Sequence, residues 1–342
     1  MKRSAVIAFI ICGVVAGLGA VIGTQGGDGD DRSATAKPFD FDVPLSFEVD
    51  VEGVQEVSGL AISRRSTGFL YAHEDSGNAK RLLVLDHVGK PRCFYEVSAA
   101  RNFDWEDMAV ASEQRTGRSF VVIGDLGRNL KELGVSEPRF VVALEPDVGA
   151  DLAALFERAS KREKREQQAG LPRLRTKSAN EWRLSYAGLE PDDYPDIEAL
   201  WFDPVSQRFG LVAKTTRDRA EIWSVTPPEV WDRDSSLVAS RVAYLPVHGS
   251  KRKRMVTSAC FEPVTRRVVL TTYDEVHVLE APELGRTPGA ALIRVTSQRH
   301  PLPFQGQVEA STVLDPGRVL VAAEGRPARF AVVAMPRHNA RH

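Results

Sequence analysis

Carboxylate side chains recur in this chain beside short apolar segments, at positions where strands are expected to begin or end. A few hydroxyl, amide and cationic side chains occupy the remaining positions of the same kind. If these strand ends meet on one face of the protein, the carboxylates become crowded. The polar residues at these positions are His73, Glu74, Asp75, Asn78, Asp104, Glu106, Asp107, Asp125, Asp196, Glu198, Lys214, Arg217, Thr257, Tyr273, Asp274, Glu309 and Glu324.

Crowded carboxylates repel one another and lose solvation, so some of them must be protonated, hydrogen-bonded or neutralised by cations. A hard cation such as calcium takes about six to eight oxygen ligands in a tolerant geometry. Zinc fits this composition less well, because the 7 histidines show no ligand spacing. Calcium is therefore the cofactor that the sequence favours.

Three glutamates are the best candidates for metal ligands, because they occupy equivalent positions in three copies of an internal repeat. They are Glu106, Glu198 and Glu309, and the further candidate ligands around them are Asp104, Asp107 and Asp125. The alternative is that these acids cap turns and accept hydrogen bonds from backbone N–H groups, with no metal bound.

Lys214, Arg217 and Tyr273 stand where the other copies of the repeat carry acids. A cationic patch beside a bound metal could hold a phosphate or carboxylate group, so these three residues are the candidate ligand-binding residues. The alternative is that the two cations balance the acids as salt bridges.

Signatures of several other classes of protein are missing. The sequence contains no GxSxG, P-loop, HExxH or CxxC motif and no GxGxxG that opens a helix, so no activated serine or cysteine nucleophile can be named. The 45 basic and 46 acidic side chains nearly cancel. A nucleic-acid partner is therefore not expected.

A pattern of three apolar segments recurs five times and must position these residues. The segments are short, rich in Val, Leu, Ile and aromatic residues, and bounded by Gly, Pro, Asp and Asn, which is typical of β-strands. The first segments are 58–62, 106–110, 198–202, 257–261 and 309–313; the second are 68–75, 119–126, 208–215, 267–274 and 318–325; the third are 80–86, 138–146, 220–227, 275–282 and 328–335.

A fourth strand follows four of the copies, and a lone strand at 41–50 precedes the first copy. Pairing this lone strand with the last copy closes a ring and hides two sheet edges. The expected fourth strands are 92–98, 181–188, 240–247 and 292–298. The sequence thus predicts an all-β β-propeller of five four-stranded blades closed by an N-terminal strand, with six blades as the alternative. Strands that alternate in direction place the residues above on one face.

Two segments depart from the repeat. In residues 147–180, Leu152, Leu155 and Phe156 recur at helical spacing, which predicts a helical insertion between the third and fourth strands of the second blade. The basic run at 251–254 is expected to be a solvated loop, and the alternative is a compact basic site for a partner.

The first 23 residues predict export. Lys2 and Arg3 precede an apolar run at 5–23, which is typical of a signal peptide and almost long enough for an uncleaved membrane anchor. Either form delivers the rest of the chain to the periplasm, the extracellular space or the outer side of the cytoplasmic membrane, with membrane contact only through this segment. Residues 24–37 are polar and rich in Gly and Asp, so we expect a flexible linker before a propeller domain at 38–342.

The segment DWEDMAV at 104–110, followed by VVIGDLGRN at 121–129, resembles the DWEDIA…GDIGDN pattern of secreted bacterial propeller-like proteins of uncharacterised function. Weaker matches such as SGLAIS at 58–63 and DIEALWFDP at 196–204 extend the resemblance over nearly all of 56–326. Arg128 and Thr271 depart from the family pattern, which usually has Asp and Arg there. The resemblance implies an exported propeller and brings no agreed reaction. A more distant likeness to calcium-dependent propeller phosphatases and lactonases concerns only architecture and acid placement.

Two functions follow from these observations. The first is an exported propeller whose acidic, calcium-binding face binds a small anionic or sugar-derived ligand or an extracellular protein partner. The second is a metal-dependent hydrolase of phosphoesters or lactones, in which the ion would polarise the ester and activate a water. The sequence names no substrate for either.

Overall fold

The computed structural model describes residues 41–128, 134, 137–161, 170–280, 284–285, 291–292, 298–302 and 306–335. All of them lie in one compact unit, Pro38–His342. The expected signal peptide or anchor and the expected linker lie outside the described residues. Within the described ranges, neither helix has the length and apolar character that a membrane crossing requires.

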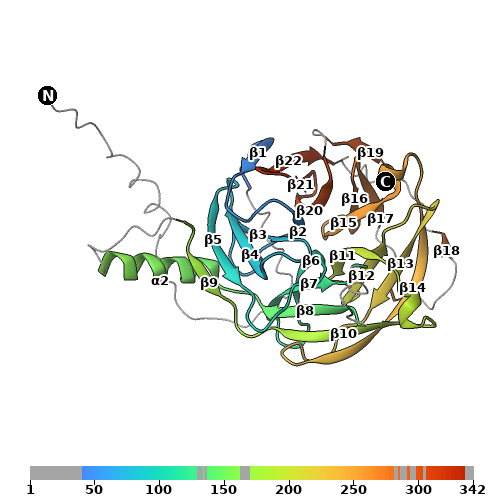
Figure 1. The fold of residues 1–342 in the computed structure, drawn as a ribbon, viewed down its shortest axis with the longest axis horizontal. Helices are drawn as coiled ribbons and strands as arrows, with labels where there is room; N and C mark the ends of the chain where they lie inside the picture. The colour runs from blue at the N-terminus through green and yellow to red at the C-terminus, as the bar shows by residue number, and fades with distance from the viewer. Residues whose placement is uncertain are drawn as a thin grey trace, which may run out of the picture. The chain divides into compact units, whose positions relative to one another are not determined.

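The described chain is an all-β propeller, as the sequence predicts (Figure 1). The first group of strands is β2 (Val57–Ile62), β3 (Phe69–Glu74), β4 (Arg81–Asp86) and β5 (Pro91–Glu96). The second is β6 (Trp105–Ser112), β7 (Ser119–Asp125), β8 (Arg139–Leu144) and β10 (Asn180–Tyr186). The third is β11 (Ile197–Asp203), β12 (Arg208–Ala213), β13 (Arg219–Val225) and β14 (Ser235–Pro246).

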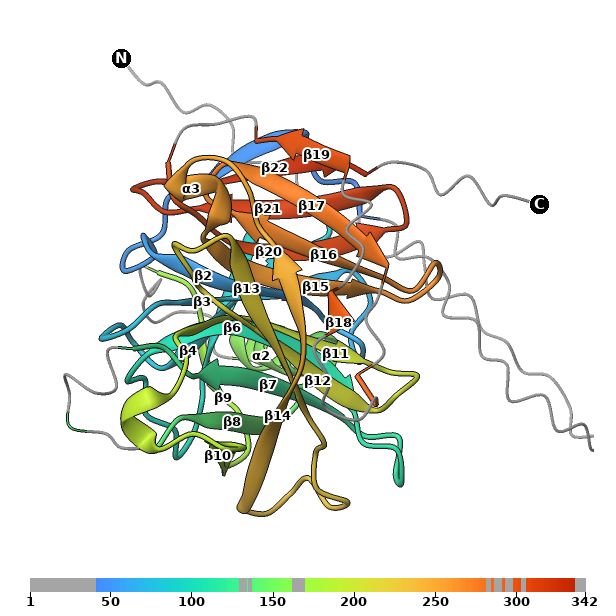
Figure 2. The same cartoon turned by 90° about the vertical axis from the view of Figure 1, so that its right-hand side faces the viewer.

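The fourth group is β15 (Val256–Glu262), β16 (Arg267–Thr272), β17 (Glu275–Glu280) and β19 (Gln298–Pro301). The fifth is β20 (Val308–Asp315), β21 (Arg318–Ala323), β22 (Ala328–Ala334) and β1 (Ser46–Val49). Within each group, neighbouring strands pair antiparallel, and the first strands β2, β6, β11, β15 and β20 contact one another in a closed ring. Figure 2 shows the groups from the side.

The N-terminal strand closes the ring as expected. β1 pairs antiparallel with β22, from Ser46 opposite Ala331 to Val49 opposite Ala328. The Phe47 and Phe330 rings stack at 4.8 Å between centroids. The last group therefore combines the two ends of the described chain, and β1 covers the edge that β22 would otherwise expose.

The pairing differs from the expectation in three places. β10 and β14 pair in parallel and join the second and third groups into one nine-stranded sheet, so the count of five separate blades remains our interpretation. β18 (Ala291–Leu292) pairs with β14, which was not expected. Most of the expected strand at 292–298 lies outside the described residues, and β19, which begins at Gln298, pairs with β17. The insertion contains the expected helix, α2 (Val148–Lys161), but also β9 (Arg173–Arg175), which pairs with β5.

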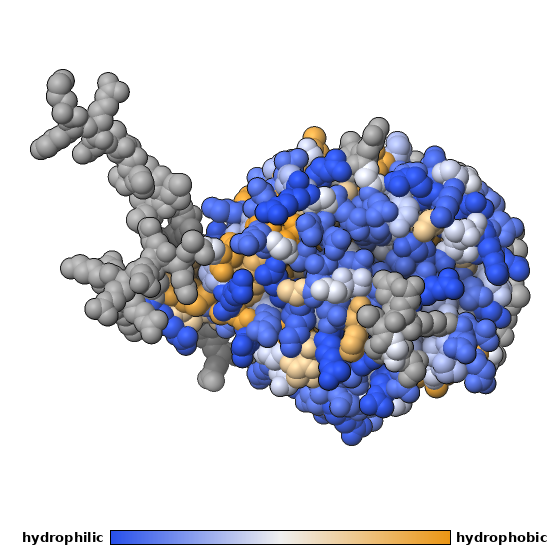
Figure 3. Space-filling view, in the orientation of Figure 1, coloured by the Kyte–Doolittle hydropathy of each residue, from blue (hydrophilic) through white to orange (hydrophobic). Residues whose placement is uncertain are grey.

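Aromatic side chains fill the core between the second and third groups. Trp182, Phe209 and Trp231 are buried and meet at centroid distances of 5.2 to 6.4 Å. The face shown in Figure 3 is mainly hydrophilic. The basic run forms a short helix, α3 (Lys251–Arg254), just before β15, and a single 3-10 turn spans Pro191–Asp193.

Candidate functional site

Each of the five first strands has a β-bulge near its start. The register shifts between Val57 and Gly59 in β2, and at the equivalent points of β6, β11, β15 and β20. The residues at the five bulges are Ser58, Glu106 with Asp107, Glu198, Thr257 and Glu309. A bulge re-aims a side chain and interrupts the ladder, so the recurring shift explains why the three candidate glutamates occupy one level of the ring.

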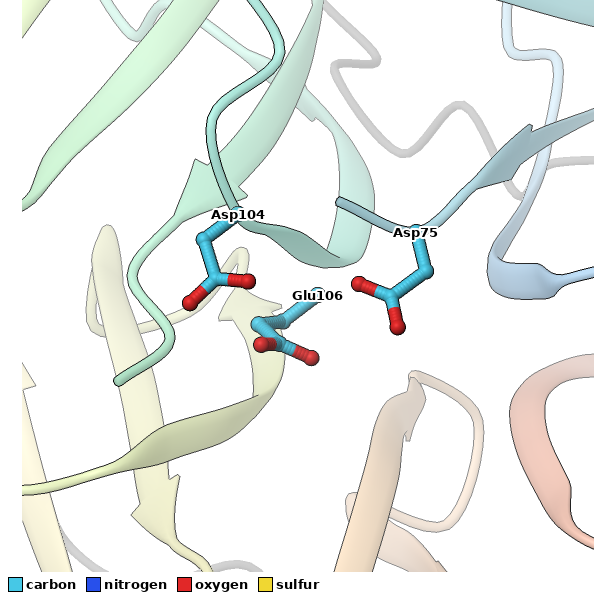
Figure 4. A group of neighbouring side chains, drawn as sticks. All are labelled: Asp75, Asp104 and Glu106. Atoms are coloured by element: carbon cyan, nitrogen blue, oxygen red, sulfur yellow. The ribbon is translucent and has the colours of Figure 1, made fainter. Parts of the chain in front are cut away.

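Three carboxylates lie close together at this level, and we call Asp75, Asp104 and Glu106 the acidic triad. One oxygen from each lies within 4.8 Å of the others (Figure 4). Asp75 directly follows β3, Asp104 directly precedes β6, and Glu106 is in the β6 bulge. Asp104 and Glu106 are 0% and 7% exposed, whereas Asp75 is half-buried. The group is therefore nearly dry on the β6 side and open to solvent on the β3 side.

Gly127 packs directly against this triad. A Cβ at Gly127 would lie 1.9 Å from Glu106 Oε1 and 2.3 Å from Asp104 Oδ2. Glycine alone leaves room for both carboxylates at their present positions. The absence of a side chain at this position is thus part of the site.

Burial and mutual repulsion raise the pKa of Glu106 well above its ordinary value, and the repelling charges are Glu198, Asp75 and Asp104. Burial likewise raises the pKa of Asp75, against the lowering effect of Lys214. A cation bound between them would relieve this repulsion and favour the ionised forms. Carboxylate oxygens are the ligands that calcium prefers, so the donor chemistry and the space left by Gly127 both fit such an ion.

The second feature of the site is an ion pair beside the triad. Lys214, which directly follows β12, places Nζ 2.8 Å from Glu198 Oε2 and 5.4 Å from the centre of the Tyr273 ring. Burial raises the pKa of Glu198 to about 7, and Lys214 opposes that rise. Glu309 is 8% exposed, and burial raises its pKa well above the ordinary value while Lys214 lowers it.

The structure thus brings most of the candidate residues together. Glu106 and Asp104 belong to the triad, while Glu198, Glu309, Lys214 and Tyr273 form the adjoining ion-pair cluster. Asp75 was not among the expected ligands, because its DSG context is typical of a turn. In the sequence, only the position of Gly127 in the GDLG turn sets it apart, so it was not predicted as a site residue.

Asp107 is placed differently from the other acids. Its two carboxylate oxygens accept 2.9 Å hydrogen bonds from the backbone N–H groups of Met108, Leu200 and Ala259, and Ser258 Oγ lies at 3.3 Å. Asp107 thereby ties β6 to β11 and β15. With its oxygens used in this way, we assign it to holding the ring together and not to metal ligation.

Asp125 contacts the acidic triad through the backbone of Asp104. Its Oδ1 accepts a 2.6 Å hydrogen bond from the Asp104 backbone N–H, and Arg139 Nε lies 3.6 Å from its Oδ2. Burial raises the pKa of Asp125 to about 7. Asp125 therefore fixes the backbone that presents Asp104.

Arg217 is exposed, and its described contact is a 3.1 Å hydrogen bond from its own backbone N–H to Thr215 Oγ1. A different arginine reaches Tyr273. Arg252, in α3, lies with Cζ 5.1 Å from the centre of that ring and donates to Asp274 Oδ1 at 2.8 Å. The basic run was expected to be a solvated loop, but it forms α3, and nothing in its composition indicated that Arg252 would reach Tyr273.

Together, the fold and the site define the chain as a β-propeller with an acidic cluster at one end of its ring of first strands. No family model matches the chain, and no curated protein matches it. Among solved structures, it is similar to a PQQ-bound aldose sugar dehydrogenase from Streptomyces coelicolor, with 11% identity, a TM-score of 0.42, and coverage of 85% of this chain and 99% of that chain. It is also similar to the structure of U3-55K, with 10% identity, a TM-score of 0.36, and coverage of 82% and 68%. Likenesses this distant carry no conclusion about the site.

Proposed function

We propose that this chain is an exported propeller that binds a divalent cation, with calcium preferred, at Asp75, Asp104 and Glu106. The cation-bound face then binds a small anionic or sugar-derived ligand or an extracellular partner. The observation that carries the proposal is the acidic triad itself, with three carboxylate oxygens within 4.8 Å of one another around a glycine that leaves them room.

The donor set explains the choice of ion. Three carboxylates supply part of the oxygen shell that calcium requires, and water or ligand oxygens complete it on the half-buried Asp75 side. A bound ion would supply positive charge to attract the hydroxyl, carboxylate or phosphate oxygens of a ligand. Tyr273 and Lys214 border the same region and would contact that ligand.

Thermal unfolding of the purified chain with added calcium, and with a chelator, tests the proposal beside elemental analysis. At 100 times its dissociation constant, a ligand stabilises the folded state by about 2.7 kcal/mol, which raises the Tm by roughly 5 °C or more. Glu106→Gln should lose the shift, while the matched Arg217→Gln, on an exposed side chain, should keep it. A wild-type protein with no bound metal and no shift would exclude the proposed site.

The alternative function from the sequence is a metal-dependent hydrolase, and assays on the same protein decide between the two functions. Calcium-loaded wild type would be assayed with phosphoesters and lactones, beside Glu198→Gln. Turnover that disappears in this variant, with its Tm unchanged, would support hydrolysis. Calcium binding without turnover would support the binding function, which pull-downs of extracellular partners would then pursue.

A further inference from the structure

Two basic segments that are separated in the sequence lie next to each other in the fold. The first runs from the end of β12 into the start of β13 and contains Arg217 and Arg219. The second follows β14 and contains the four basic residues of α3. The backbone N–H of Val247 donates to the carbonyl oxygen of Asp218 at 2.9 Å and joins the two segments. They therefore form one surface.

Four cationic side chains of these segments are exposed, and we call them the basic surface: Arg217, Arg219, Lys251 and Arg252. Asp218 is the acid that the two segments contain. Arg252 forms an ion pair with Asp274, whereas the ion pairs among the described residues include none for the other three cations. The basic surface thus carries positive charge that these ion pairs leave unbalanced.

Two of the four cations are held in place by aromatic rings. Arg219 places Cζ 4.8 Å from the centre of the Tyr244 ring, and Arg252 places Cζ 5.1 Å from the centre of the Tyr273 ring. Cation–π attraction restrains such side chains. A side chain that is already ordered loses less conformational entropy when a partner binds, so this arrangement favours recognition of an anion.

We propose that the basic surface binds a short acidic segment of a partner protein, whose Asp and Glu carboxylates pair with these four side chains. Guanidinium groups match the geometry of carboxylates, and Arg252 already donates from Nε to Asp274 Oδ1 at 2.8 Å. The basic surface includes no residue of the acidic triad. The inference therefore goes beyond the proposed function and does not depend on a bound cation.

The surroundings of the basic surface favour a short acidic segment over a membrane or a long polyanion. The large apolar side chains that are exposed in the described chain lie outside both segments, so the basic surface has none to insert into a bilayer. Arg252 Nη2 donates to the carbonyl oxygen of Gly306, and the neighbouring Gln307 donates to Glu324. Acids thus begin where the basic surface ends, and they would repel a polyanion that extends past it.

The test is fluorescence anisotropy of the full chain with a labelled peptide of about ten glutamates, in low salt. A calcium chelator in the buffer keeps the proposed cation site out of the measurement. The triple variant Arg217→Gln, Arg219→Gln and Lys251→Gln should weaken binding about 10-fold or more, because each exposed ion pair contributes a small part of the affinity. Raising the salt from about 50 mM to about 500 mM should also weaken wild-type binding about 10-fold.

The matched control removes the same charge from three exposed side chains elsewhere, in the first group of strands and around β9. It combines Lys90→Gln, Arg173→Gln and Lys177→Gln, and it should bind the peptide as tightly as wild type. If the first triple variant does not fold, Arg217→Gln and Lys251→Gln are tested singly, and each should weaken binding about threefold.

The outcomes separate this inference from the proposed function. Wild type that does not bind the peptide at about 1 mM, or a folded triple variant that binds it as tightly as wild type, would overturn the inference. Tighter binding of wild type to vesicles of anionic phospholipid or to long polyphosphate, with the same loss in the triple variant, would overturn the choice of a protein partner. Calcium binding at the acidic triad is measured without peptide, so its failure would leave the result for the basic surface unchanged.

Discussion

Replacement of Gly127 by alanine tests the acidic triad most directly, because it adds one methyl group and removes no ligand. The new Cβ would lie 1.9 Å from Glu106 Oε1 and 2.3 Å from Asp104 Oδ2. Non-bonded atoms rarely approach closer than about 3 Å, so both carboxylates must retreat by about 1 Å. Calcium–oxygen bonds are only about 2.3–2.6 Å long, so a retreat of this size removes two ligands from their coordinating positions.

We expect Gly127→Ala to weaken calcium binding about 10- to 100-fold, which corresponds to about 1.4–2.7 kcal/mol of binding free energy. The fold should survive, because the atoms that must move are the ends of two side chains. Isothermal titration calorimetry in calcium-depleted buffer measures the affinity, and circular dichroism during heating measures the Tm.

Gly285→Ala is the matched control, because a Cβ at Gly285 meets no atom within 4 Å. It should bind calcium with wild-type affinity. A Gly127→Ala protein that is folded and binds calcium as tightly as wild type would show that the ion does not bind between Asp104 and Glu106.

Three further predictions concern the scaffold. Asp107→Asn, measured by urea unfolding, should lower the free energy of unfolding by about 2–4 kcal/mol, because a single amide oxygen cannot accept all the backbone N–H bonds that the carboxylate accepts; an unchanged value would refute its role in tying the strands together. Deletion of residues 38–50 removes β1 and bares the β22 edge, so cooperative thermal unfolding should be lost, and a stable truncated protein would contradict the closure. Burial raises the pKa of Glu145, so its contribution to stability is present below about pH 4.5 and is lost as the pH rises through the folded-state value. Glu145→Gln should therefore gain stability relative to wild type in urea as the pH rises above about 4.5, and a constant difference would refute this assignment.

Most of the observed order of strands could be predicted from the repeat, because short apolar segments bounded by turn residues are typical of β-strands. The same pattern predicted that the lone strand near the N-terminus completes the last group. It could not predict that β9 pairs with β5 or that β18 pairs with β14, because such short strands have little apolar pattern of their own and are fixed by their partners.

The repeat pattern alone predicts that carboxylates from several copies lie on one face, since alternating strand direction places equivalent residues at one end of the ring. Which of these carboxylates are neighbours depends on the three-dimensional packing. Asp107 and Glu106 are neighbours in the chain, yet backbone N–H groups from β11 and β15 surround Asp107, while Glu106 faces Asp75 and Asp104. Likewise, Arg217 remains exposed and Arg252 contacts Tyr273. Sequence spacing fixes the strand and the face of a residue, but the bulges and the packing of neighbouring strands fix the direction of each side chain.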